Sequence, residues 1–495
     1  MSLSSYLKQK AISALTPTTT PSNSAPANAA TANAAPANTA PTVPVPAVPI
    51  TAAPPVAAPS SRFNLNMPNF KSVTSEALST IGGGIIPTGI DSTDNNNTAN
   101  PPIGGIWPRV TLPNHPRLPV VRHPSGFIPP ETPNYSISEE KLKAAIQLDG
   151  DWDKYIDLNP VLLVPGTGSY GGSCYHHNFA KLLRNASPRF ATFAWVNVPG
   201  AMCDESPKNA EYIAYAMHWL WLRTYRGYSE ADINKHQITV IGWSQGNLSI
   251  QWALKYWPHT RNLIKSFVAI SADFHGTLLA PPVAAAPAIL HQWYWSNFIR
   301  TLRANGGDSA YVPTTSIYSS FYDEVVQPQI GDIASAYMKD ERGVGVLNFD
   351  LQQRCPLKPA GVLHGHSGVL YNNVAWALTK DAIINGGPAS IGPGRVDLPT
   401  ESMQLWAPGL NPLDIAATIA LIPVAGINML KFFPIAVVER PLPEYAAKES
   451  AALGPAPALT AEQQAIVDAN KNKPLFPAKP AVDPNIASAL GAPTT

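Results

Sequence analysis

The stretch that decides the fold is ITVIGWSQGNLSIQWALKYW, residues 238–257. Its first six residues form an apolar run typical of a buried strand, and its last eleven carry apolar residues at helical spacing. Gly242-Trp243-Ser244-Gln245-Gly246 joins the two halves. A G-x-S-x-G turn between a strand and a helix predicts a nucleophile elbow, in which glycines leave room for a serine in a strained conformation. The helix that follows would direct its first amides at developing negative charge.

The region around this turn alternates between strand and helix signals. Further strands are expected at 161–164, 191–198, 266–271 and 314–320, and the clearest helices at 209–225 and 247–257. Continuous apolar strands separated by helices predict an α/β fold, with a mostly parallel central sheet covered by helices on both faces. In such sheets ligands bind at the carboxyl ends of the strands, where Ser244 falls.

Composition divides the 495 residues into three parts. Proline is abundant, at 52 residues, and it gathers toward the two ends of the chain. Residues 1–118 are rich in Pro, Ala, Thr and Asn and are expected to form a disordered N-terminal region and linker. Residues 119–450 form the expected catalytic domain, and 451–495 a Pro/Ala-rich C-terminal tail with one short helical pattern at 459–470.

Charge and ligand patterns exclude several function classes. The formal net charge is +1 and no basic block is present, so nothing favours a nucleic-acid partner. The three cysteines lack metal-site spacing, and neither His176-His177 nor His364-x-His366 has an evident third ligand. The sequence has no dinucleotide-binding or P-loop motif. We therefore expect neither a metal nor a cofactor.

A serine nucleophile needs a base and an acid to orient that base. In this fold the acid and then the histidine follow the serine along the chain. SIYSSFYDEVVQPQ (316–329) offers Asp323 and Glu324 after a strand, and the loop at 361–368 offers His364 and His366. On the residues alone, either acid and either histidine could serve.

The negative charge of a tetrahedral intermediate needs backbone amides aimed at it. One is expected from Gln245, directly after the nucleophile. The other is expected from VLLVPGTGSYGG (161–172), where Thr167 lies between two glycines and could donate both its amide and its hydroxyl.

Several of these blocks occur together in one order: LLVPGTG, WSQG, DFHGT, VPTT with IYS and VQPQ, and HSG. Together they resemble the fungal lipases of the Candida antarctica lipase B type over about residues 120–440. The resemblance implies an α/β-hydrolase fold with a triad of Ser244, Asp323 and His366 and an oxyanion hole of Thr167 and Gln245. It also implies that Trp243, Asp273 and Gln292 line the substrate pocket, and that the apolar segment 413–438 forms a helical cap near the active-site entrance rather than a membrane span.

This reading predicts a serine carboxylic-ester hydrolase, a triacylglycerol lipase or esterase that works through an acyl-enzyme. Two alternatives stay open: the same machinery on another acyl substrate, and a catalytically inactive surface module. The expected partners are an ester or lipid substrate and a transient lipid interface, and the expected state is a monomer.

Two expectations concern the compartment. Cys174 and Cys203 follow two successive strands at the same end of the sheet, so a disulfide between them is hypothesised for an oxidising environment. The family is secreted, and Asn96, Asn134 and Asn185 lie in glycosylation sequons, but no secretory signal is visible. Localisation therefore stays open.

Overall fold

The computed structural model describes residues 132–225, 236–280, 285–362 and 364–470. These residues all lie in one compact unit, Lys71–Thr495. The predicted disordered region 1–118 lies outside the described residues, as does the tail beyond 470.

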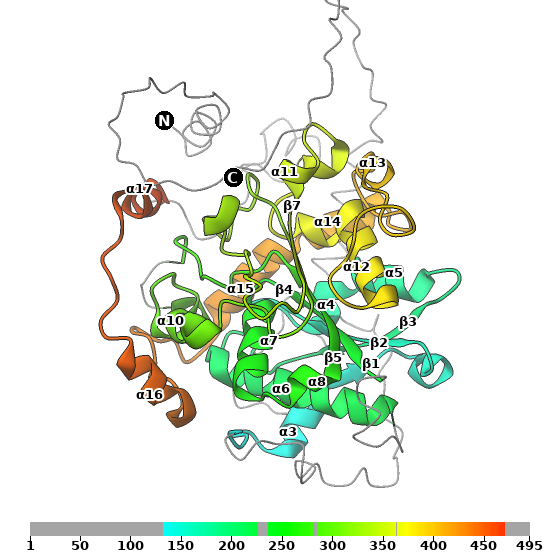
Figure 1. Ribbon diagram of the computed structural model, residues 1–495. Coiled ribbons are helices and arrows are strands. Elements are labelled where there is room, and N and C mark those ends of the chain that lie inside the picture. Colours follow the sequence, from blue (N-terminus) through cyan, green and yellow to red (C-terminus); the bar gives the residue numbers. More distant parts are fainter. Residues whose placement is uncertain (1–131, 226–235, 281–284, 363, 471–495) are drawn as a thin grey trace, which may run out of the picture. The chain divides into compact units, whose positions relative to one another are not determined.

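A seven-stranded sheet in the order β1-β3-β2-β4-β5-β6-β7 forms the centre of the fold (Figure 1). The strands are β1 (Ile146–Leu148), β2 (Asn159–Val164), β3 (Ala191–Val196), β4 (Ile238–Trp243), β5 (Ile264–Ile270), β6 (Thr314–Tyr318) and β7 (Val346–Asp350). All neighbours pair in parallel except β1, which runs antiparallel to β3. The mostly parallel sheet is thus confirmed, with all five predicted strands in it.

Both faces of the sheet are buried because neighbouring residues of a strand point to opposite sides. On β4, Val240 belongs to one apolar core and Ile241 to the other. The first core packs under helices α3 (Glu139–Ala144), α6 (Ser206–Thr224), α7 (Gln245–Tyr256), α8 (Thr260–Leu263) and α10 (Asn297–Arg303). The second packs under α4 (Gly171–Tyr175), α5 (Phe179–Asn185) and α12 (Asn373–Asn385).

The apolar segment predicted as a cap forms two consecutive helices, α14 (Pro412–Ile419) and α15 (Leu421–Lys431), which meet at Ala420. Among the described residues, only 412–431 is long and apolar enough to cross a membrane, a property that buried helices share. α15 lies directly on the loop after β2, because the side-chain amide of Asn428 donates to the carbonyl of Gly168 at 2.8 Å. A Cβ on Gly168 would come within 2.4 Å of the Ala425 carbonyl oxygen, so this contact requires glycine.

The remaining helices are short or lie at the edges: α9 (Pro287–His291), α11 (Leu351–Arg354), α13 (Leu398–Glu401), α16 (Glu444–Ala452) and α17 (Ala461–Asn470). α16 crosses the expected start of the C-terminal tail at residue 451. It belongs to the packed domain, because Glu449 accepts hydrogen bonds from Lys255 and Tyr256 on α7 at 2.7 and 2.6 Å. α17 matches the helical pattern at 459–470.

Candidate active site

Ser244 lies at the turn between β4 and α7 in a conformation that side chains rarely adopt, with φ 54° and ψ −132°. Its amide donates to the carbonyl of Ile270 at 3.0 Å, which ties the turn to the end of β5. The glycines of the motif are required by close contacts, because a Cβ on Gly246 would approach the Val164 oxygen to 2.5 Å and one on Gly242 the Asn247 side chain to 2.4 Å. The strand, strained serine and helix of a nucleophile elbow are therefore all present.

His366 and Asp323 form a buried ion pair near the elbow. The Nδ1 of His366 lies 2.9 Å and 3.1 Å from the two carboxylate oxygens of Asp323. Asp323 is itself held by the amides of Val325 and Val326, which both donate to Oδ1 at 3.0 and 2.8 Å. The ring nitrogen that faces away from Asp323, His366 Nε2, has no hydrogen-bond partner among the described residues. Among the described residues, therefore, Ser244 and His366 are not joined by a hydrogen bond.

Two more carboxyl groups surround this pair. Glu324 accepts a hydrogen bond from the backbone amide of His366 at 2.9 Å, and burial beside Asp323 raises its pKa. Asp273 is fully buried, its carboxylate oxygens have no hydrogen-bond partner in another described residue, and burial raises its pKa to about 7. Burial works to lower the pKa of His366, but the Asp323 carboxylate outweighs it and the pKa is raised on balance. The site therefore favours a proton on His366.

The structure distinguishes between the two candidate histidines. The Nε2 of His364 lies 2.8 Å from the carbonyl of Leu405, and its ring packs on Tyr371. Burial lowers the pKa of His364 to about 4, and its ring makes no hydrogen bond to a carboxylate of the described residues. His364 is therefore placed as a neutral structural residue, whereas His366 faces the acid.

The predicted oxyanion residues lie together at the ends of β2 and β4. Thr167 Oγ1 donates to Gln245 Oε1 at 2.9 Å and accepts from Gln292 Nε2 at 2.9 Å. Within the described ranges, the backbone amides of Thr167 and Gln245 have no recorded acceptor, so both are free to bind an anion. Gly166 is packed under the serine, since a Cβ there would come within 2.8 Å of the Ser244 Cβ.

A small pocket of about 70 Å³ opens beside these groups. Thr167, Gln292 and Glu324 line it together with apolar side chains, among them Leu279, Ile289, Val325 and Met429. Met429 belongs to α15, so the apolar cap forms part of the pocket wall. Of the three residues predicted to line the pocket, only Gln292 does so directly. Trp243 packs against the His366 ring, at 5.3 Å between ring centres, and Asp273 lies buried near the ion pair.

The hypothesised disulfide is wrong. Cys174, Cys203 and Cys355 are all free and buried. Cys174 lies in the core of the α4–α12 face, while Cys203 lies in a separate small cluster with Phe432. Both follow strands at the same end of the sheet as expected, but their side chains enter different apolar clusters, and the Cys203 thiol donates to the Ala201 carbonyl at 3.6 Å.

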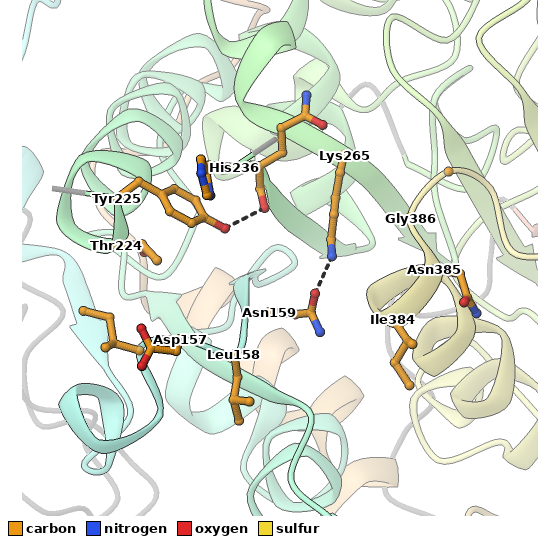
Figure 2. Close-up of a pocket in the computed structure, with 13 residues that line it drawn as sticks. Asp157, Leu158, Asn159, Thr224, Tyr225, His236, Lys265, Ile384, Asn385 and Gly386 are labelled. Atoms are coloured by element: carbon orange, nitrogen blue, oxygen red, sulfur yellow. Dashed lines mark hydrogen bonds between the residues drawn. The ribbon is translucent and has the colours of Figure 1, made fainter. Parts of the chain in front are cut away.

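A larger cavity of about 650 Å³ lies at the other end of the parallel strands from Ser244 (Figure 2). It is lined by residues at the amino ends of the strands, including Asn159 and Lys265. The Lys265 amine donates to the Asn159 side chain and to the Ile383 carbonyl at 2.6 and 2.7 Å, and burial lowers its pKa to about 8. No predicted site residue lines this cavity, so it is distinct from the serine site.

Two residues that hold the site were not predicted from sequence. Ser271, with φ 47°, donates from its hydroxyl to the carbonyl of His366 at 2.8 Å and fixes the histidine loop. Ser206, the first residue of α6, accepts from the Gln245 side chain at 3.1 Å. A serine outside any motif gives no sequence signal for such contacts, which depend on segments far apart in the chain.

Comparison with known proteins identifies relatives of this chain. No family model matches the chain. Lipase B of Pseudozyma antarctica is 30% identical over 270 residues, which cover 53% of this chain and 71% of that protein. The crystal structure of Aspergillus fumigatus lipase B is 41% identical with a TM-score of 0.59, over 64% of this chain and 74% of that one. These matches confirm the resemblance drawn from the sequence motifs, and the observed sheet confirms the fold. The chain therefore belongs to the family of fungal B-type lipases, carboxylic-ester hydrolases of the α/β-hydrolase fold.

Proposed function

We propose that the protein hydrolyses esters of apolar acyl chains, as a triacylglycerol lipase or esterase, with Ser244, His366 and Asp323 as its catalytic triad. The observation that carries this proposal is the strained serine on its elbow beside a histidine whose far ring nitrogen is paired with a buried carboxylate. Within the described part of the chain, His366 Nε2 has no hydrogen-bond partner, as a base awaiting the serine proton would be.

The chemistry follows the two-step scheme of serine hydrolases. Ser244 Oγ attacks the ester carbonyl carbon as its proton passes to His366 Nε2, while Asp323 holds the proton on Nδ1. The amides of Thr167 and Gln245 bind the oxyanion. The imidazolium then returns its proton to the departing alcohol, leaving an acyl group on the serine. Water, deprotonated by His366, repeats the sequence and releases the carboxylic acid.

The acyl side of the site supports an apolar substrate. Apolar side chains form much of the small pocket, and exposed apolar side chains continue along the outer surface of the cap. The most exposed are Leu430 at 80% and Phe433, Val437 and Val438 at 70%. Such a surface is suited to transient contact with a lipid interface. We propose that a monomer carries out this reaction, because Ser244, His366 and Asp323 all come from one chain.

The test is Ser244→Ala in the full chain, assayed on soluble p-nitrophenyl butyrate and on emulsified tributyrin. Loss of at least about 10³-fold in kcat on both substrates supports the triad, since removing a nucleophile costs a large part of the rate enhancement. Ser249→Ala is the matched control: Ser249 is also buried on α7, but its hydroxyl has no hydrogen-bond partner among the described residues. Activity of the Ser244 variant within tenfold of wild type would refute the assignment. If the wild-type protein hydrolyses p-nitrophenyl butyrate but not emulsified tributyrin, it is an esterase and not a lipase.

A further inference from the structure

We propose that Ser206 is a positioning residue of the oxyanion hole, because its hydroxyl fixes the side-chain amide of Gln245 and, through it, the hydroxyl of Thr167. This inference rests on the proposed function, since it takes Thr167 and Gln245 as the groups that bind the oxyanion.

The structure gives each hydrogen bond around Thr167 a direction. Gln292 Nε2 uses its two hydrogens on the Ala288 carbonyl and on Thr167 Oγ1, both at 2.9 Å. The Thr167 hydroxyl therefore accepts from Gln292 and has its single hydrogen left to donate. Its nearest recorded acceptor is Gln245 Oε1 at 2.9 Å, compared with 3.2 Å to Gln292 Oε1.

This direction decides how the Gln245 amide must lie. Its oxygen has to face Thr167, so its nitrogen faces the other way, toward Ser206 Oγ at 3.1 Å. Both Gln245 and Ser206 are completely buried, so water cannot replace either partner. Without the Ser206 hydroxyl, Gln245 Nε2 would be a buried donor with no acceptor, a state that folded proteins avoid. The Gln245 side chain would turn away, and the loop that carries the Thr167 backbone amide would lose one of the hydrogen bonds that hold it.

Ser206 is itself held rigidly. As the first residue of α6 it has a backbone amide without a partner inside the helix, and this amide donates to His291 Nδ1 at 3.0 Å. Burial lowers the pKa of His291 to about 4, so at neutral pH the imidazole is uncharged and Nδ1 accepts this bond. The start of α6 is thereby fixed against α9, the helix that also carries the Gln292 side chain at its end.

The effect on catalysis is expected in the transition state. The oxyanion forms only after the substrate is attacked, so a displaced Thr167 backbone amide should lower kcat and leave KM nearly unchanged. A full oxyanion donor contributes about 10²–10³-fold, and a displaced one should cost part of that, about tenfold. A purely structural loss would instead lower stability and the fraction of active enzyme, which active-site titration measures separately.

The experiment measures kcat and KM of the full chain on p-nitrophenyl butyrate, normalised by active-site titration. Ser206→Ala should lower kcat about tenfold with KM within about twofold, and Ser206→Thr, which keeps a hydroxyl, should recover most of the loss. In a Thr167→Val background, Ser206→Ala should lower kcat less than about twofold, because the Gln245 side chain then has no Thr167 hydroxyl to contact. Ser249→Ala again serves as the control for removing a buried serine hydroxyl near this site.

An equal loss from Ser206→Ala in both backgrounds, or no loss in the wild-type background, would overturn the proposal. If Ser206→Ala does not fold, Gln245→Met replaces it, since this variant keeps the backbone amide and removes only the side-chain amide. It must then lower kcat to a similar degree, and unchanged kcat would also overturn the proposal. The proposed function fails by a different result, namely retained turnover in the Ser244→Ala variant.

Discussion

Replacement of Asp323 by asparagine tests the histidine geometry most sharply. In the structure Oδ1 accepts from the amides of Val325 and Val326 and lies 3.1 Å from His366 Nδ1, and Oδ2 is the nearer oxygen to Nδ1, at 2.9 Å. An asparagine must keep its carbonyl oxygen where the two amides donate. Its NH₂ group is then placed against Nδ1 of His366, and two donors cannot face each other there.

A change of tautomer relieves this conflict at the shorter of the two contacts with Nδ1. Nδ1 becomes the acceptor and the proton moves to Nε2, the nitrogen that should receive the proton of Ser244. The variant therefore has a base in the wrong form, and we expect kcat to fall about 10⁴-fold, equivalent to about 5 kcal/mol of transition-state stabilisation. The backbone bonds to Oδ1 are retained, so the fold should survive.

The assay is steady-state hydrolysis of p-nitrophenyl butyrate at several pH values, with thermal unfolding measured in parallel. Asp381→Asn is the matched control, because Asp381 is a buried carboxylate on α12 that pairs with Arg395 at 2.6 Å, outside the site. It should alter stability and leave kcat near wild type. A loss below tenfold for Asp323→Asn, with the protein folded, would refute the assignment of this carboxylate as the orienting acid.

Three further outcomes follow from the structure. The base must be unprotonated, and the Asp323 carboxylate raises the pKa of His366 despite its burial. We therefore expect kcat/KM to rise with pH through a midpoint above 6.5, the usual pKa of histidine, and a midpoint below that value would contradict the ion pair. Gly166→Ala should reduce kcat at least about 100-fold by displacing the elbow, whereas Gly150→Ala, where an added Cβ meets nothing within 4 Å, should be silent; equal activities would contradict the packing. Lys265, whose pKa burial lowers to about 8, should be acetylated at pH 8.5 ahead of the exposed Lys448, as peptide mass spectrometry would show; the reverse order would contradict the accessible, uncharged amine.

Local patterns predicted much of the fold. Long apolar strands such as β4 and β5 are buried on both faces, so their composition alone indicates their position. β1 escaped prediction because three residues give no periodicity, and β7 because it begins with three half-buried residues in a mixed pattern. The break between α14 and α15 at Ala420 could not be placed either, since Pro423 near the start of α15 is tolerated in a first turn.

The site, like the fold, has features that the sequence predicts and others that depend on tertiary contacts. The elbow is visible in sequence because strain forces glycines on either side of Ser244. Residue types alone left His364 and His366 open, because both lie in one glycine-rich loop. The family resemblance implied His366, and in the structure the contacts with Asp323 and Leu405 separate the two histidines. The cysteine hypothesis failed for a related reason: strand order brings Cys174 and Cys203 to one end of the sheet, but their side chains enter different apolar clusters.

The most direct test of the account is the site of reaction with a fluorophosphonate probe, because only an activated serine nucleophile attacks it. The full chain should take up one phosphonate per molecule, located on Ser244 by peptide mass spectrometry, with hydrolysis of p-nitrophenyl butyrate lost in proportion. The Ser244→Ala variant should take up none. Absence of labelling, or labelling at another residue with hydrolysis retained, would contradict the claim that Ser244 is the nucleophile.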